Sequence, residues 1–231
     1  MQIKRNQLTG SIAAVALATG SMAASAQSFD EMEFDPSLSA GFTVANMYLF
    51  RGADLNSGTP LVAGSIEADS GVGFYAGAWT AGGDSNTEID LYGGYAFEVA
   101  DALTLDFHVT NFIFPNRNPS DTAAGADSNN FGDFTEVGVT ASAAGASFTY
   151  LNNVAGDAGY EYFNASYGYG PFSIALGHNK FRGAGDDTHL DLGFDFNENL
   201  SFTVSQLVDT PSGAKDSTNF LVSYSRSFSF Q

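Results

Sequence analysis

Apolar and polar residues alternate along most of this chain with a period of two. Near the C-terminus, for example, Leu190, Leu192 and Phe194 alternate with Asp191 and Gly193. A two-residue period places successive side chains on opposite faces of a β-strand. Because such segments recur over nearly two hundred residues, the sequence predicts an all-β fold.

We predict about twelve strands, and the connections between them alternate between long and short. Long loops at one rim and short turns at the other are typical of a transmembrane antiparallel up-and-down β-barrel, with the loops extracellular and the turns periplasmic. The predicted strands cover residues 39–50, 59–69, 72–80, 87–98, 102–114, 133–142, 145–151, 159–169, 171–180, 187–196, 199–207 and 218–230. The long connections are residues 51–58, 81–86, 115–132, 152–158, 181–186 and 208–217.

The length and composition of the strands favour a membrane barrel. Ten residues at about 3.3 Å each, tilted by about 45°, span about 23 Å, close to the apolar band of about 25 Å in outer-membrane barrels. The polar faces carry mainly Ser, Thr, Gly and Ala with a few acids and almost no Lys, whereas a water-facing sheet usually carries both signs of charge. Alternation alone would also fit a soluble barrel with apolar side chains inside, binding a lipophilic ligand.

The N-terminus has the features of an export signal. Lys4 and Arg5 precede an apolar stretch over residues 8–23, which ends in the small residues Ala24, Ser25 and Ala26. This pattern predicts a cleaved signal peptide over residues 1–26. We therefore expect an acidic periplasmic segment over 27–38, a barrel over 39–231, and a location in the bacterial outer membrane.

Charge and composition exclude several kinds of site. After removal of the signal peptide, six Lys and Arg face 26 Asp and Glu, a net charge of about −20, which argues against nucleic acid as a partner. The chain has no cysteine, so it has neither disulfides nor thiolate metal sites. Clusters of Asp, Asn and Gly at 82–86, 127–130 and 185–187 lack the spacing of calcium loops and predict turns. We expect no cofactor and no metal.

The alternation assigns most acidic residues to the inner face of the barrel. An acidic wall attracts cations and repels anions, so a conducting lumen would prefer small cationic or neutral solutes. Twelve strands leave two possibilities open: a narrow channel, or a structural or adhesive barrel whose lumen is filled by hydrogen-bonded side chains. The loop over 115–132 could constrict the lumen or remain outside. The predicted pore-lining residues are Arg51, Glu67, Glu88, Asp90, Asp106, His108, Glu136, His189, Asp191 and Asp195.

Three features do not fit this pattern simply. In the last predicted strand, Arg226 belongs to the same alternating set as the apolar residues. This places its charge on the lipid face unless a bulge turns it inward. In segment 72–80, either set of alternating residues could face outward. His178 has outward parity and is the one plausible base for a lipid hydrolase, but no Gly-x-Ser-x-Gly motif accompanies it. We therefore expect no catalytic residues and no enzymatic activity.

The expected partners are those of an outer-membrane barrel. Basic residues lie in or beside the long connections and could pair with lipopolysaccharide, although ordinary solvation explains them slightly better: Arg51, Arg117, Lys180, Arg182 and Lys215. The aromatic residues of the last strand could be recognised by the outer-membrane assembly machinery. Membrane lipid and small solutes complete the set, and the oligomeric state is left open.

Several motifs resemble the TorF family, whose members are described as porins. They are Tyr48-Leu49-Phe50-Arg51-Gly52, Gly58-Thr59-Pro60, Gly73-Phe74-Tyr75-Ala76-Gly77-Ala78-Trp79 and Glu88-Ile89-Asp90-Leu91-Tyr92-Gly93-Gly94-Tyr95. The resemblance implies an outer-membrane barrel with a channel role, and it brings no substrate or catalytic residue. After Gly52 the chain departs from the family, with Ala53-Asp54-Leu55-Asn56 in place of the more common Ile-Ser-Gln-Ser. The C-terminus also differs from that of most outer-membrane barrels, which end on an aromatic residue, because here Gln231 follows Phe230.

Overall fold

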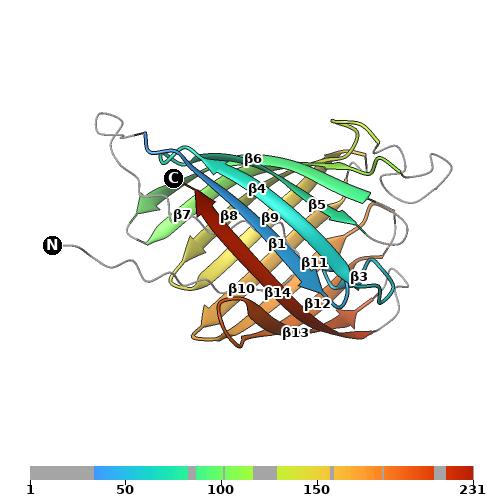
Figure 1. The fold of residues 1–231 in the computed structure, drawn as a ribbon. Helices are drawn as coiled ribbons and strands as arrows, with labels where there is room; N and C mark the ends of the chain where they lie inside the picture. The colour runs from blue at the N-terminus through green and yellow to red at the C-terminus, as the bar shows by residue number, and fades with distance from the viewer. Residues whose placement is uncertain are drawn as a thin grey trace.

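The computed structural model describes residues 34–82, 87–100, 102–116, 129–156, 159–183, 185–210 and 217–230. These residues form fourteen β-strands, twelve of which close into one antiparallel barrel (Figure 1). No helix in this part of the chain is long and apolar enough to cross a membrane. The predicted signal peptide and most of the loop over 115–132 lie outside the described residues.

Consecutive barrel strands pair with one another, and the first strand pairs with the last. β1 meets β14 in an antiparallel register from Leu38 with Phe230 to Ala45 with Ser223, which closes the barrel. Each of the twelve predicted strands corresponds to one barrel strand, so the all-β, up-and-down prediction is confirmed. The barrel strands are β1 (Ser37–Ala45), β4 (Leu61–Asp69), β5 (Phe74–Gly82), β6 (Thr87–Ala100), β7 (Leu103–Ile113), β8 (Thr135–Ala143), β9 (Ala146–Ala155), β10 (Glu161–Tyr169), β11 (Phe172–Lys180), β12 (Asp187–Asp195), β13 (Leu200–Asp209) and β14 (Thr218–Phe230).

The two ends of the barrel differ in their connections. At one end, here called the short-turn end, β1 begins, β14 ends, and neighbouring strands are joined by brief turns such as Ala144-Gly145. At the other, the long-loop end, the connections include residues 46–60 and 114–134. This alternation is the one expected of an even-stranded barrel with both termini on the same side.

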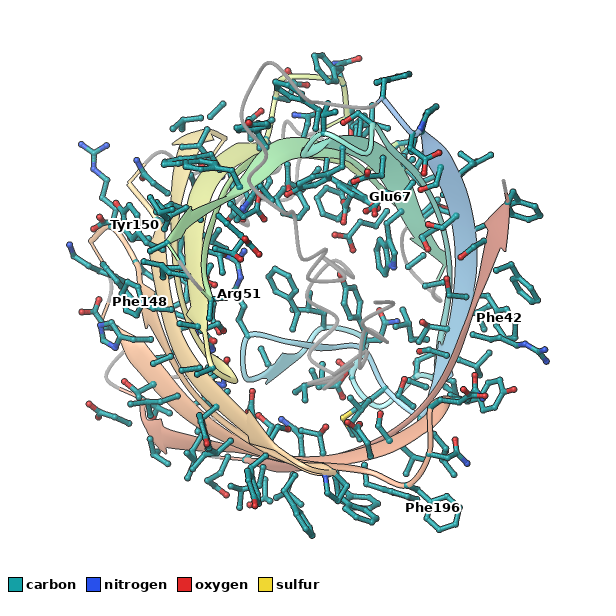
Figure 2. All side chains as sticks on the ribbon, turned by 90° about the vertical axis from the view of Figure 1, so that its left-hand side faces the viewer. Phe42, Arg51, Glu67, Phe148, Tyr150 and Phe196 are labelled. Carbon is teal, nitrogen blue, oxygen red and sulfur yellow. The ribbon has the colours of Figure 1, made fainter. Side chains whose placement is uncertain are left out.

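Apolar side chains cover the outside of the barrel. Phe42, Phe148 and Phe196 all point away from the ring of strands (Figure 2), and many other large apolar residues are exposed. The buried inner positions instead include acids, amides and hydroxyls, among them Asp90 and Ser205. A soluble barrel has the opposite distribution, with apolar residues inside. The pattern therefore argues against the soluble alternative.

The first predicted strand was too long, and this is the main error in the strand assignment. β1 ends at Ala45, whereas the prediction continued to Phe50. The next residues turn away and form a separate two-stranded hairpin, β2 (Leu49–Phe50) with β3 (Ala53–Asp54). Met47 to Phe50 are four consecutive apolar residues, so they lack the two-residue alternation of a strand with one lipid-facing side.

Two other uncertain features have definite positions in the structure. In β5, Phe74 is exposed and Trp79 is buried, so Tyr75, Gly77 and Trp79 form the inner set. Arg226 is exposed on the outer face, and its guanidinium lies 5.3 Å from the centre of the Phe228 ring. The register between β1 and β14 is unbroken, so no bulge turns Arg226 inward.

Candidate functional site

The hairpin of β2 and β3 lies inside the barrel. It belongs to the connection between β1 and β4 at the long-loop end, and Figure 2, viewed along the barrel, shows this pale blue segment within the ring of strands. Tyr48 and Leu49 are only 5% and 1% exposed. Sequence reasoning treated residues 51–58 as an ordinary long connection, so the structure adds an element to the lumen that was not predicted.

Apolar contacts hold the base of the hairpin against one wall. Leu49 belongs to a buried cluster that includes Leu61 and Leu221 on the inner faces of β4 and β14. The ring of Tyr48 lies 6.0 Å from that of Trp79 on β5, and its hydroxyl donates a hydrogen bond of 2.9 Å to Glu88 on β6. Burial raises the pKa of Tyr48 well above its usual value, and the nearby charge of Glu88 adds to this shift. Tyr48 is therefore a neutral donor.

Arg51, at the tip of the hairpin, reaches the opposite wall. Its guanidinium donates two hydrogen bonds to the carboxylate of Glu136 on β8, at 2.9 and 2.6 Å, and one of 3.0 Å to the hydroxyl of Tyr160. The planar fork of a guanidinium matches the two oxygens of a carboxylate. The rings of Phe50 and Tyr162 lie 4.6 and 4.7 Å from the guanidinium carbon, close enough for cation–π attraction.

The charge of Arg51 is secured by these contacts. Burial alone would lower the pKa of a guanidinium, but the negative charge of Glu136 and the hydrogen bonds to Glu136 and Tyr160 outweigh that effect. The pKa of Arg51 therefore lies above its usual value. An ion pair so thoroughly buried is strongly destabilised when one partner is lost, because the other charge remains without compensation.

The backbone of the hairpin tip is also fixed from two parts of the wall, by β11 on the far side and by β14, the neighbour of β1. The side-chain amides of Asn179 on β11 and Asn219 on β14 donate to the carbonyls of Arg51 and Gly52, at 3.0 and 3.4 Å. Gly52 has a φ of 86°, and a Cβ atom there would lie 2.6 Å from the Cβ of His189 on β12. Because the hairpin leaves β1 and contacts strands on the far side of the ring, it crosses the lumen.

Six of the predicted pore-lining residues lie close together near the long-loop end. Arg51 and Glu136 form the ion pair, and the charged neighbours of Asp90 are Glu88, Glu136 and Arg51. His189 lies beside this group, with its Nδ1 3.1 Å from Asp191. We call these residues the long-loop cluster: Arg51, Glu88, Asp90, Glu136, His189 and Asp191. Apart from Arg51, which keeps slight exposure, all are buried.

Three further predicted residues form a second group nearer the short-turn end. The hydroxyl of Tyr75 donates to Asp106 at 2.9 Å, and the Nδ1 of His108 lies 3.5 Å from the same carboxylate. The hydroxyl of Tyr92 donates to Glu67 at 3.0 Å. The structure thus brings Glu67, Asp106 and His108 to one region of the inner wall. Asp195, at the end of β12, belongs to neither group.

The lumen differs along its length. On the inner face of β14, Leu221 and Ser223 beside the hairpin are buried, whereas Ser225 and Ser227 nearer the short-turn end are exposed. Ser225 shares a hydrogen bond of 2.8 Å with Thr43 across the β1–β14 seam. This wall is therefore accessible to solvent beyond the hairpin, whereas at the long-loop end the hairpin covers it.

Several contributors to the site carried no clear signal in the sequence. Phe50, Tyr160, Tyr162 and Asn179 surround or anchor Arg51 but had no predicted role. The loss of alternation after Ala45 could have indicated that the chain leaves the barrel wall. It could not have indicated which strands the hairpin meets, because those contacts join residues up to 167 positions apart.

His178, the candidate hydrolase base, lies on the outer side of β11. Its Nδ1 lies 2.9 Å from the hydroxyl of Thr188, and its Nε2 lies 3.6 Å from the carboxylate of Asp186. Neither of these partners is a serine. Among the described residues, no group of three or more His, Cys, Asp or Glu side chains could hold a metal ion.

Comparisons with known proteins agree with the fold. The family model Gcw_chp, described as a bacterial protein of unknown function, matches residues 32–210. No curated protein matches the chain. The resemblance to the TorF family therefore stays a prediction, since the matching family bears another name.

Solved structures similar to this chain include membrane proteins of low sequence identity. A membrane protein from a study of in-meso crystallization has a TM-score of 0.53 at 13% identity, covering 84% of each chain. The KdgM porin has a TM-score of 0.46 at 10% identity, covering 84% of this chain and 98% of its own. An outer membrane channel from Pseudomonas putida F1 has a TM-score of 0.38 at 12% identity, covering 88% and 100%. At these identities the likeness concerns the fold alone.

Proposed function

The chain belongs to the Gcw_chp family, and we propose that it forms a narrow outer-membrane channel for the passive diffusion of small solutes. One observation carries this proposal: the barrel is apolar outside and lined inside by titratable side chains, with a hairpin across its lumen. A closed barrel satisfies every strand hydrogen bond internally, which is what a hydrocarbon environment requires. The proposal includes no enzymatic activity.

The outer surface supports a location in the outer membrane. Barrel strands of nine or more residues carry exposed apolar side chains on one face along most of their length, including Ile66, Phe107 and Leu192. This band suits lipid, because aqueous solvent would oppose so large an exposed apolar surface. The basic side chain of Arg226 lies toward the short-turn half of β14, from where it can extend toward lipid head groups.

The inner wall supports a preference for cations over anions. Its predicted acids are Glu67, Glu88, Asp90, Asp106, Glu136, Asp191 and Asp195, and the one predicted basic residue with a permanent charge is Arg51. In a lumen with low-dielectric walls, such an excess of carboxylates concentrates cations and repels anions. The hairpin would act as the constriction, so the channel admits small solutes.

A specific observation also favours a second function, a non-conducting structural or adhesive barrel. The cluster formed by Leu49, Leu61, Trp79, Leu221 and their neighbours is an apolar core within the lumen, which is unusual for a water-filled passage. If the polar side chains around Arg51 close the remaining space, no ion could pass. Conductance separates the two functions.

The test is electrical. The folded chain in detergent is inserted into a planar lipid bilayer, and single-channel current and reversal potential are measured under a potassium chloride gradient. We expect discrete current steps and a reversal potential of the sign that indicates cation preference. Folded barrels that insert into the bilayer without current would overturn the channel and support the filled barrel, whereas anion preference would overturn the role of the acidic wall.

A further inference from the structure

The surroundings of Arg51 have the form of a binding site for a guanidinium group. Glu136 presents both carboxylate oxygens, Tyr160 presents a hydroxyl oxygen as acceptor, and Tyr162 presents its ring face. Glu136 lies on β8 and Tyr162 on β10, Tyr160 directly precedes β10, and each of the three is at most 8% exposed. The guanidinium comes from the connection between β1 and β4, which is a separate element.

The two tyrosines of the site each have a hydrogen-bond partner other than Arg51. The hydroxyl of Tyr160 donates a hydrogen bond of 2.7 Å to the side chain of Asn179, which leaves its lone pairs directed to the incoming N–H group. The hydroxyl of Tyr162 lies 3.1 Å from Nε2 of His189, whose Nδ1 is in turn 3.1 Å from Asp191. The two tyrosines would therefore keep their positions if the Arg51 side chain left the site.

One buried carboxyl group beside this site has an oxygen atom that could accept a further hydrogen bond. Asp90 is 2% exposed, and its Oδ1 has no hydrogen-bond partner among the described residues. Its charged neighbours are Glu88, Glu136 and Arg51, so three acids surround one basic group. A buried carboxyl oxygen without a donor is costly, and a solute that brings N–H donors would satisfy it.

We propose that Arg51 is a tethered occupant of a guanidinium-binding subsite formed by Glu136, Tyr160 and Tyr162, and that solutes bearing a guanidinium group compete with it. This inference rests on the proposed channel function for its physiological meaning, since it names the class of solute that the lumen recognises. Guanidinium groups fit better than compact ammonium ions, because a planar fork engages both oxygens of Glu136 while stacking on Tyr162.

Binding of methylguanidinium to Arg51→Ala tests the inference without any current. Calorimetry in detergent compares the wild type, R51A, the double variant R51A/E136Q, and the matched control R51A/E198Q. Glu198 is an exposed acid in a turn at the short-turn end, so its loss changes the net charge equally but leaves the site intact. Tetramethylammonium serves as a second probe, with the same charge and no N–H donors.

We expect R51A and R51A/E198Q to bind methylguanidinium with the same affinity. The wild type and R51A/E136Q should bind it at least about tenfold more weakly, given the usual contribution of a hydrogen bond to a charged group. The affinity of R51A for tetramethylammonium should be lower than its affinity for methylguanidinium by a similar factor. Equal affinities of R51A and R51A/E136Q, or of the two probes, would overturn the subsite.

Folding and conduction give independent outcomes. If R51A does not fold in buffer, its refolding with methylguanidinium but not with tetramethylammonium supports the subsite, and failure with both overturns it. Binding to a barrel that never conducts would overturn the channel and leave the subsite. Conduction without any methylguanidinium binding to folded R51A would overturn the subsite and leave the channel.

Discussion

At the scale of single residues, Gly52 sets how closely the hairpin tip approaches the wall. Its φ of 86° and the absence of a Cβ allow the backbone to lie against His189. Gly58, in the same connection, has a nearly identical φ of 83°, but nothing lies within 4 Å of the position that its Cβ would occupy. A substitution at Gly58 therefore tests backbone strain alone, whereas one at Gly52 tests strain together with contact against His189.

Alanine at these two positions should have different effects. Gly58→Ala should cost about 1–2 kcal/mol, the usual strain of a left-handed backbone at a non-glycine residue. Gly52→Ala should add about 1–3 kcal/mol of overpacking against His189 and shift the hairpin out of place. Trp79 is the one tryptophan of the chain and contacts Tyr48, so its fluorescence reports the hairpin position directly. Equal spectra and equal urea midpoints for G52A and G58A would contradict this prediction.

At the scale of elements, the hairpin could be removed without disturbing the strands that flank it. Ala45 and Leu61 face each other directly in the β1–β4 register, so a two-residue turn can join them. The hairpin contributes no hydrogen bonds to the barrel ladder, because β2 and β3 pair with each other. It is therefore an insertion into the lumen carried by a complete barrel.

Replacement of residues 46–60 by Asn-Gly should leave a folded barrel with a larger single-channel conductance. The variant should also lose stability, by at least about 1.5–3 kcal/mol from the burial of Leu49 alone. Bilayer recordings and urea titration measure the two effects. Leu55→Ser is the control, since that side chain is exposed on the hairpin and its loss should change neither quantity. A replacement variant with wild-type conductance would show that the hairpin is not the constriction.

The strands could be predicted from sequence, but the hairpin could not, for a physical reason. A strand between lipid and a polar lumen must alternate, so parity alone identified twelve strands and, for Arg226, the outward face. Residues 47–50 are apolar because they pack inside the lumen against β4, β5 and β14, and a local pattern cannot reveal such distant partners. The pairing of Arg51 with Glu136, 85 positions away, is equally invisible to local periodicity.

At the scale of the whole molecule, the barrel reverses the usual distribution of polarity. Six of the seven acids that the alternation assigned to the inside lie in two groups, one beside the hairpin with Asp90 and Asp191 and one nearer the short-turn end with Asp106. A solute crossing the lumen would meet both groups in turn. If the proposed channel conducts, the two groups would act on ion selectivity at different depths of the lumen, although each is hydrogen-bonded or ion-paired to different neighbours.

Replacing Asp90, Asp106 and Asp191 together with Asn should therefore reduce cation selectivity without unfolding the barrel. Asn is nearly isosteric and keeps one acceptor oxygen, so the strand pairing and most hydrogen bonds persist. The cation-to-anion permeability ratio should fall by about tenfold, toward the lower end of the concentrating effect of a charged cleft. Reversal potentials under a salt gradient measure this ratio. The control Asp35→Asn/Glu198→Gln/Asp209→Asn removes the same charge from exposed positions outside the strand interiors, and it should keep the wild-type ratio. If both triple variants shift the ratio equally, selectivity arises from the overall charge of the molecule rather than from the acids inside the lumen.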